Sequence, residues 1–210
     1  MADLKFYTNP MSRGQIVRWM LEEVGQPYET IVVDYAHMHD PEYALVNPMM
    51  KVPALVHDGR IVTECAAIIA YLADVFPAAG LAPSDSEKAD YYRWLFFAAG
   101  PIEQAVTNHA NGWDPSEERR RMFGYGSYDD AMAALAAHLA ANDFVCGDRF
   151  TAADVYVGSQ VLWGTQFGTM PSLDPFVAYA GRLERRPAYL RGKDIDNQLI
   201  TEMKAKEDAQ

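Results

Sequence analysis

The sequence predicts two domains, an α/β domain followed by an all-α domain. Up to residue 77, short β-prone segments alternate with segments whose apolar residues recur at helical spacing. After a stretch rich in Pro, Ala and Ser at 77–86, the strand signals largely disappear and the helical spacing continues. The chain has 210 residues, of which 50% are hydrophobic, so it can build an ample core and is not disordered as a whole.

The first half begins with a strand, a helix and a second strand. Leu4–Tyr7 is β-prone, and Ser12–Val24 carries a helical apolar stripe behind a serine that suits an N-cap. Gly25 and Pro27 end this helix, and the apolar run within Tyr28–Asp34 predicts the next strand. A β-α-β start requires a right-handed crossover and a parallel pair of strands.

The rest of this domain is predicted to hold a short helix, a hairpin and a longer helix. Pro41–Val46 suits the short helix. Val52–Val56 and Arg60–Thr63 flank an Asp-Gly pair, which is a strong hairpin signal. Glu64–Phe76 carries one apolar helical stripe. The order β-α-β-α-β-β-α favours a four-stranded mixed sheet with helices on its faces.

The second half of the chain is predicted to be helical. Glu87–His109 predicts a long helix that Gly100-Pro101 kinks or divides. Asp114-Pro115 is expected to open a helix that runs to Leu139. The segment Phe150-Thr-Ala-Ala-Asp154 then starts a further helix with an N-terminal box.

Domain boundaries follow from these signals. Two shorter helices, near Pro175–Arg185 and Pro187–Arg191, complete the helical domain. The expected organisation is an α/β domain at 1–77, a linker at 78–87, an all-helical domain at 88–193 and a charged C-terminal tail at 194–210.

Composition excludes several classes of protein. Eighteen basic and 29 acidic residues give a net charge of −11, which disfavours a nucleic-acid surface. The sequence contains no apolar run of membrane-helix length and no signal-peptide pattern at its start, so a cytoplasmic protein is expected. The two cysteines form no CxxC motif, and only His37 and His39 among the five histidines are close in sequence. We therefore expect no metal site.

Residues 47–72 are the most informative segment for function. Pro53 follows Val52 at the mouth of a short strand, where its missing N–H suits a strand's first position. The second strand of the hairpin runs into a helix that starts with Glu64 and Cys65. A strand edge that faces a helix N-terminus with a carboxylate can hold a peptide by main-chain pairing and by contacts to its charged ends.

In the order and spacing of its motifs, the chain resembles the cytosolic glutathione S-transferases of bacterial type. The motifs are the polar loop after the first strand, Lys51-Val-Pro-Ala-Leu55, Glu64-Cys-Ala-Ala-Ile68 and Phe150-Thr-Ala-Ala-Asp154. The resemblance covers nearly the whole chain. It implies a thioredoxin-like βαβαββα domain that binds glutathione, a helical domain that holds most of a small hydrophobic electrophile, a cis Val52–Pro53 bond, a detoxifying transferase activity and a homodimer.

The thiol of glutathione must be ionised to act as a nucleophile. A hydroxyl or amide donor near a helix N-terminus stabilises such a thiolate. The loop from Tyr7 to Arg13 supplies three candidates. Ser12 comes first because serine-type members place their hydroxyl in this turn, Tyr7 is its rival at the end of the first strand, and Asn9 is third. As alternatives, Ser12 is an ordinary helix cap and Tyr7 a packed strand residue.

The resemblance also assigns residues that hold glutathione. The backbone of Val52, before Pro53, pairs with the cysteinyl part, Glu64 meets the γ-glutamyl ammonium, and the Cys65 N–H meets the neighbouring carboxylate. The family usually has serine where Cys65 stands, and a thiol is a poor donor. Lys51 is expected to reach the glycyl carboxylate, with His39 as a weaker candidate; a solvated surface lysine is the alternative for Lys51.

An apolar pocket with a few polar groups suits the electrophile. The candidates lie on or after the first long helix of the second domain: Phe97, Gln104, Asn108, His109 and Trp113. Core packing is the competing explanation for the aromatic residues. Two other functions remain open: another glutathione-dependent reaction (isomerisation, ether cleavage, dehalogenation or peroxide reduction) and a non-catalytic scaffold for protein contacts.

Overall fold

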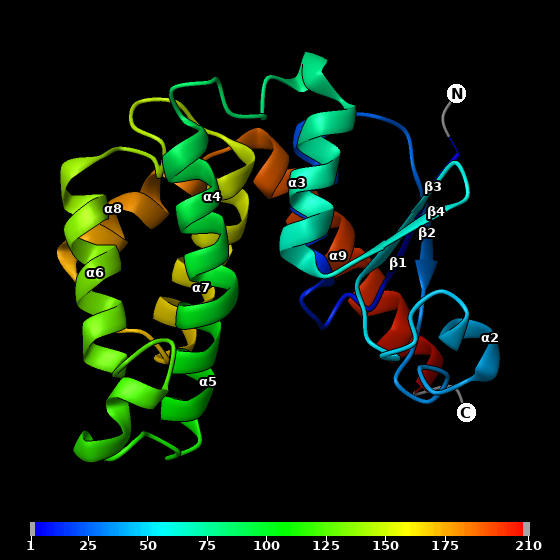
Figure 1. The fold of residues 1–210 in the computed structure, drawn as a ribbon. Helices are drawn as coiled ribbons and strands as arrows, with labels where there is room; N and C mark the ends of the chain where they lie inside the picture. The colour runs from blue at the N-terminus through cyan, green and yellow to red at the C-terminus, as the bar shows by residue number, and fades with distance from the viewer. Residues whose placement is uncertain (1–2, 208–210) are drawn as a thin grey trace. The chain divides into compact units, whose positions relative to one another are not determined.

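The structure, a computed structural model, describes residues 3–207. Its contacts divide the chain into two compact units. The sheet unit contains residues up to 79 together with the last segment from 186, and the helical unit contains residues 80–185. In Figure 1 the blue and cyan segments and the red C-terminal helix belong to the sheet unit.

The sheet has four strands in the order β2-β1-β3-β4. They are β1 (Leu4–Thr8), β2 (Glu29–Val32), β3 (Ala54–His57) and β4 (Arg60–Thr63). β1 runs parallel to β2, and the β1–β3 and β3–β4 pairs are antiparallel. This arrangement confirms the predicted four-stranded mixed sheet.

Two helices lie between the strands in the chain, α1 (Gly14–Val24) and α2 (Pro41–Ala44). After β4 come α3 (Cys65–Val75) and a short 3-10 turn, η1 (Pro77–Ala79). Gly14 lets α1 start close to the end of β1, because a Cβ at this position would lie 1.9 Å from the Thr8 Oγ1 atom. Gly25 ends α1 with a φ of 71°, as its position in the sequence predicts.

The last helix corrects the sequence-based expectation. Instead of a short helix at 187–191 and a charged tail from 194, α9 runs from Pro187 to Glu207 and belongs to the sheet unit rather than to the helical one. Two arginines at its start contact α1: Arg186, directly before α9, donates to Glu23 at 2.6 and 2.8 Å, and Arg191 donates to Glu22 at 3.1 Å. Residues 208–210 of the expected tail lie outside the described residues.

A buried ion pair joins α1 to α9. The Arg18 Nε atom lies 3.2 Å from Asp196 Oδ1, and the two side chains are 1% and 3% exposed. Arg18 Nη1 also donates to Thr30 at 2.7 Å and to Tyr28 at 3.1 Å, and the guanidinium lies 4.9 Å from the Phe6 ring centroid. The pair therefore links α9 to the α1-facing side of the sheet.

The helical unit is built from five α-helices, a π-helical turn and a 3-10 turn within residues 80–185. They are α4 (Lys88–Phe97), η2 (Ala98–Ile102), α5 (Glu103–Ala110), η3 (Glu117–Met122), α6 (Tyr128–Ala141), α7 (Ala152–Phe167) and α8 (Asp174–Leu183). The predicted division at Gly100-Pro101 is confirmed, because η2 is a π-helix that contains Pro101. A proline has no N–H to give to the ladder, and wider π geometry accommodates its ring.

The helix expected to open at Asp114 begins only at Tyr128. Residues 117–122 form a 3-10 turn instead, and Gly126 adopts a φ of 69°, which an α-helix does not allow. Ser127 then caps α6 by accepting a hydrogen bond from the Asp130 N–H at 3.1 Å. Local backbone conformation thus outweighs the apolar spacing before residue 127.

The predicted N-terminal box of α7 is present around Asp154. One carboxylate oxygen accepts from the Thr151 N–H at 2.8 Å and from the Thr151 hydroxyl at 3.2 Å. The other accepts from the Val145 N–H and from the Tyr179 hydroxyl, both at 2.8 Å. Burial raises the pKa of Asp154 to about 6, and these donors act in the opposite direction. Asp154 therefore fixes the start of α7, the loop before it and α8.

None of the helices within residues 3–207 combines the length and the apolar character that a membrane crossing requires.

Candidate active site

Three segments of the sheet unit meet at one end of the sheet. Tyr7 of β1 is paired with Ala54 of β3, and Ala54 is paired with Thr63 of β4. The loop after β1, the residues before β3 and the start of α3 therefore lie together. Direct contact supports this placement, because the Cys65 thiol donates to the Arg13 carbonyl across 3.7 Å.

Asn9 shapes the loop after β1. Its side chain is buried, its Nδ2 donates to the Val33 carbonyl at 3.1 Å, and its Oδ1 accepts from the Met11 N–H at 2.9 Å. Both ends of the amide are thus occupied inside the protein. This geometry disfavours Asn9 as a donor to a bound thiol.

Ser12 lies half-buried just before α1. Its hydroxyl donates to the Asn9 carbonyl at 2.6 Å and accepts from the Gly14 N–H at 3.0 Å. The oxygen therefore sits at the positive end of the α1 dipole, where an anion is stabilised. Its proton is used within the loop, so a thiolate must compete with the Asn9 carbonyl for it.

Tyr7 offers the other hydroxyl. The side chain is half-buried, and its ring centroid lies 6.0 Å from that of Tyr43. Within residues 3–207, no group forms a hydrogen bond with the Tyr7 hydroxyl. Tyr7 can thus donate to a ligand without losing an existing contact.

Val52 presents an unpaired backbone. The Val52–Pro53 peptide bond is cis, as the resemblance implies, and regular pairing of β3 begins only at Ala54. Neither the N–H nor the C=O of Val52 has a hydrogen-bond partner in the described part of the chain. The side chain packs against a buried cluster of Val33, Met38 and Tyr43.

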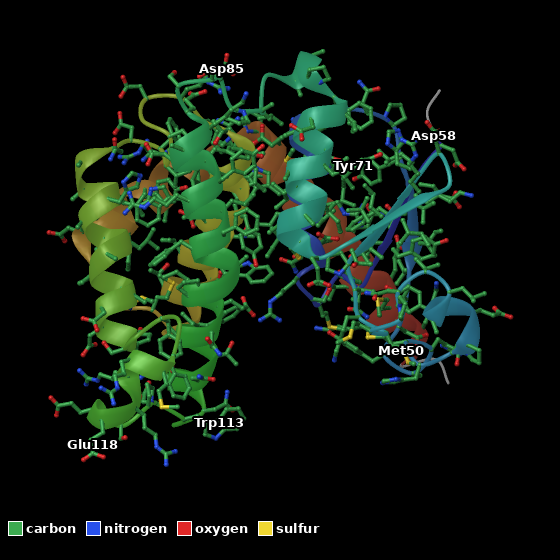
Figure 2. All side chains as sticks on the ribbon, in the orientation of Figure 1. Met50, Asp58, Tyr71, Asp85, Trp113 and Glu118 are labelled. Carbon is green, nitrogen blue, oxygen red and sulfur yellow. The ribbon has the colours of Figure 1, made fainter. Side chains whose placement is uncertain are left out.

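Lys51 follows Met50 in the chain, and His39 contacts the Met50 side chain. The Lys51 side chain is exposed and forms no ion pair with the residues that the structure describes. The His39 Nδ1 lies 3.2 Å from the Met50 sulfur, and Figure 2 labels Met50 beside α2. Lys51 directly precedes Val52, and His39 contacts the same segment through the Met50 side chain.

Glu64 sits at the N-cap of α3 in an unusual conformation. Its φ and ψ are 66° and 122°, although it is not a glycine. A residue held in such a region costs about 1–3 kcal/mol and tends to occur at functional sites. The side chain is exposed and makes no cap bond, so its carboxylate is available to a ligand cation.

Cys65 is the first residue of α3 and is 8% exposed. Its thiol faces the Arg13 carbonyl, so the side chain joins α3 to the loop after β1. The first N–H groups of a helix have no partner within the helix and carry its positive end, which in α3 lies next to Glu64.

Five residues of the helical unit were predicted to contact the electrophile, and two of them bond to other residues of that unit. Asn108 donates to the Tyr125 hydroxyl at 3.0 Å. His109 lies 2.8 Å from an Asp114 oxygen and stacks on Tyr128 with ring centroids 3.9 Å apart. These contacts hold the end of α5 against α6.

The side chains of the other three candidates are half-buried or exposed. Phe97 is half-buried beside Trp94, with ring centroids 5.2 Å apart. Gln104 is exposed, and Trp113 is 66% exposed at the end of the unit where α5 stops (Figure 2). Phe97, Gln104 and Trp113 therefore stay as candidates for contact with an electrophile.

Sequence reasoning missed two residues beside the site. The Tyr43 hydroxyl and the Asn47 Nδ2 both donate to the Lys51 carbonyl, each at 2.7 Å. The only signal in the sequence was the position of Asn47-Pro48 directly before Lys51-Val52-Pro53.

Among residues 3–207, no group of three or more His, Cys, Asp or Glu side chains is placed to hold a metal ion.

Comparison with known proteins identifies the class to which this fold and site belong. The family described as "Glutathione S-transferase, N-terminal domain" matches residues 11–75, and "Glutathione S-transferase, C-terminal domain" matches residues 103–166. The chain belongs to the glutathione S-transferase family. The fold class and family predicted from the sequence are thereby confirmed, and the reading of the chain as a glutathione S-transferase agrees with them.

Individual relatives are similar over most of their length. Glutathione S-transferase GST-4.5 of Xanthomonas campestris pv. campestris is 29% identical over 190 residues, which cover 82% of this chain and 90% of that protein. Maleylacetoacetate isomerase of Pseudomonas aeruginosa is 30% identical over 176 residues, covering 79% and 83%. The solved structure of a sphingomonad glutathione S-transferase complexed with glutathione is 29% identical, has a TM-score of 0.74 and covers 92% of this chain and 98% of that one.

Proposed function

We propose that the sheet unit binds glutathione and that the enzyme transfers the glutathione thiolate to small hydrophobic electrophiles. The observation that carries this proposal is the unpaired backbone of Val52 beside the exposed carboxylate of Glu64 at the α3 N-terminus. The sphingomonad relative described as complexed with glutathione supports the choice of ligand.

The peptide backbone and the charged ends of glutathione each have a chemical counterpart at this site. Val52 pairs with the cysteinyl backbone as an added strand residue. Glu64 binds the γ-glutamyl ammonium, and the α3 N-terminus, beginning at Cys65, binds the carboxylate of the same residue. Lys51 binds the glycyl carboxylate, and His39 is the weaker candidate for the same contact.

Ser12 is our first candidate for the sulfur donor, because its oxygen lies at the start of α1. Tyr7 is the second candidate, favoured by its hydroxyl without a partner in residues 3–207. Either hydroxyl lowers the pKa of the bound thiol by hydrogen-bonding the thiolate more strongly than the thiol.

Replacing Ser12 by alanine is expected to return the pKa of the bound glutathione thiol toward its ordinary value of about 8.5. We expect kcat/KM with an aryl halide such as chlorodinitrobenzene to fall about 100-fold, as when another preorganised donor to a reacting anion is removed. Thiolate absorbance in the ultraviolet, recorded while glutathione bound to wild type and variant is titrated with base, measures the pKa directly.

Ser127→Ala is the matched control, since the Ser127 hydroxyl also accepts a backbone N–H at the start of a helix but lies in the helical unit. It should cost stability and leave the thiol pKa as in wild type. If Ser12→Ala also leaves the pKa unchanged while Tyr7→Phe raises it, the sulfur donor is Tyr7. Wild-type protein that binds no glutathione at millimolar concentration would overturn the proposed function and favour the scaffold alternative.

Glu64→Ala is expected to weaken glutathione binding by about 1–3 kcal/mol, because a charge-assisted bond to the ammonium is lost. Isothermal calorimetry measures the change. Glu29→Ala removes another exposed carboxylate, on β2 of the same unit, and should leave the affinity as in wild type. Equal affinity of the Glu64 variant and wild type removes Glu64 from the site.

A glutathione-dependent isomerisation is the second candidate reaction. The similarity to maleylacetoacetate isomerase over 83% of that protein favours it. The same glutathione-binding residues serve both transfer and isomerisation. The two reactions therefore differ in the residues that contact the second substrate. Phe97, Gln104 and Trp113 are our candidates for that role.

The proposal also includes assembly as a homodimer in the cytoplasm, without a bound metal ion. Membership of the glutathione S-transferase family supports the homodimer and the cytoplasmic location. The net charge of −11 disfavours nucleic acid as a partner.

A further inference from the structure

The Lys51 carbonyl is held by two buried donors. Tyr43 is 7% and Asn47 is 3% exposed, and each donates to this oxygen at 2.7 Å. A carbonyl has two lone pairs, so these two bonds satisfy it fully. The direction of the Lys51 carbonyl is thus set by side chains that lie inside the protein.

The two donors are themselves fixed. The Asn47 Oδ1 accepts from the Met49 N–H at 3.0 Å, the Asn47 N–H donates to the Tyr43 carbonyl at 2.9 Å, and the Asn47 carbonyl accepts from the Met50 N–H at 2.8 Å. Burial raises the pKa of Tyr43 to about 12, so its hydroxyl stays protonated and able to donate.

The fixed direction of the Lys51 carbonyl also fixes the direction of the Val52 N–H. The Lys51–Val52 peptide bond, which contains the Lys51 C=O and the Val52 N–H, is trans. The cis bond is the next one, Val52–Pro53. In a planar trans peptide the C=O and the N–H point in opposite directions. Because the Lys51 carbonyl points toward Tyr43 and Asn47, the Val52 N–H points away from them, on the side where no group of residues 3–207 bonds to it.

The side chain of Val52 is anchored on the same cluster, where it packs with Val33, Met38 and Tyr43. Both the side chain and the preceding peptide plane are therefore set before a ligand arrives. Preorganisation of this kind reduces the entropy lost on binding.

We propose that Tyr43 and Asn47 are positioning residues for glutathione: by holding the Lys51 carbonyl, they turn the Val52 N–H toward a carbonyl of the bound peptide. This inference rests on the proposed function, in which Val52 pairs with the cysteinyl backbone. It adds two residues that act through the Lys51–Val52 peptide without touching the ligand.

Two variants each remove one donor. Tyr43→Phe deletes the hydroxyl and keeps the ring, and Asn47→Asp keeps the oxygen that accepts from Met49 while replacing the amide donor. We expect each to weaken glutathione binding about fivefold, the value of one net hydrogen bond. The KM for glutathione should rise by a similar factor, with kcat within about twofold of wild type, since the effect is on binding alone.

A ligand without a thiol separates this role from an effect on the sulfur. γ-Glutamyl-aminobutyryl-glycine keeps the peptide backbone of glutathione and lacks the thiol, so its affinity should fall by the same factor in calorimetry. The pKa of the bound glutathione thiol should remain that of wild type. Tyr71→Phe removes a tyrosine hydroxyl that bonds His57 at 2.8 Å elsewhere in the sheet unit, and both affinities should then be unchanged.

Wild-type affinity for both ligands in folded Tyr43→Phe and Asn47→Asp overturns the inference and leaves the proposed function standing. A loss confined to glutathione, with a shifted thiol pKa, also overturns it, because Tyr43 would then act through its neighbour Tyr7. Absence of binding to the wild-type protein overturns the proposed function itself, and the inference with it. Thermal unfolding of each variant checks that the fold is retained.

Discussion

Replacing Asp154 by alanine is expected to lower the free energy of unfolding by about 3–5 kcal/mol. The change removes an acceptor that is buried at the start of α7 and that binds Val145, Thr151 and Tyr179. Buried donors that lose their partner cost about 1–3 kcal/mol each. Urea unfolding at pH 7.5, followed by circular dichroism, measures the loss.

Asp130 provides a control at the equivalent position of another helix. It is the third residue of α6, where it accepts from the Ser127 hydroxyl at 2.6 Å, but its side chain is exposed. Asp130→Ala should cost no more than about 1 kcal/mol. A loss of similar size for both variants would show that burial of Asp154 is not the cause.

Replacing Asp196 by alanine is expected to cost about 3–5 kcal/mol, because it leaves the Arg18 guanidinium buried without a counter-charge. Arg18 Nη2 and Asp196 Oδ2 already lack a hydrogen-bond partner among the described residues, so little remains to compensate. We expect loss of α9 docking at lower urea than in wild type, detected by fluorescence of Trp19, whose ring meets that of Tyr189 of α9 edge to face with centroids 5.0 Å apart.

Two further variants test the reason for this effect. Arg191→Ala removes an exposed ion pair between the same two helices, in which Arg191 is 54% exposed, and should cost about 0–1 kcal/mol. The charge-free double variant Arg18→Met with Asp196→Leu should be more stable than Asp196→Ala alone. A double variant that is less stable than the single one would contradict the explanation by an unpaired buried charge.

The parts of the site that could be predicted from the sequence are local. Lys51-Val52-Pro53 and Glu64-Cys65 each lie within a few residues of one another, and the strand pairing Tyr7–Ala54–Thr63 follows once the hairpin is recognised. The orientation of Val52 could not be predicted, because a side chain that bonds a backbone carbonyl, as Tyr43 does, leaves no spacing pattern.

The length of α9 could not be predicted for a related reason. This segment looks solvated in sequence, since Arg186 directly before the helix and Arg191 and Asp196 within it are all charged. Their partners Glu23, Glu22 and Arg18 lie on a helix near the other end of the chain. Only the folded structure shows that these charges hold a helix in place rather than a tail in solvent.

The division of the sheet unit into two chain segments has a consequence for synthesis. The ribosome produces the sheet, and then all of residues 80–185, before α9 exists. Until then α1 lacks its partner helix, and Arg18 has no Asp196 beside it. We therefore expect the nascent first segment to stay incompletely folded while the helical unit, which is continuous in sequence, folds first.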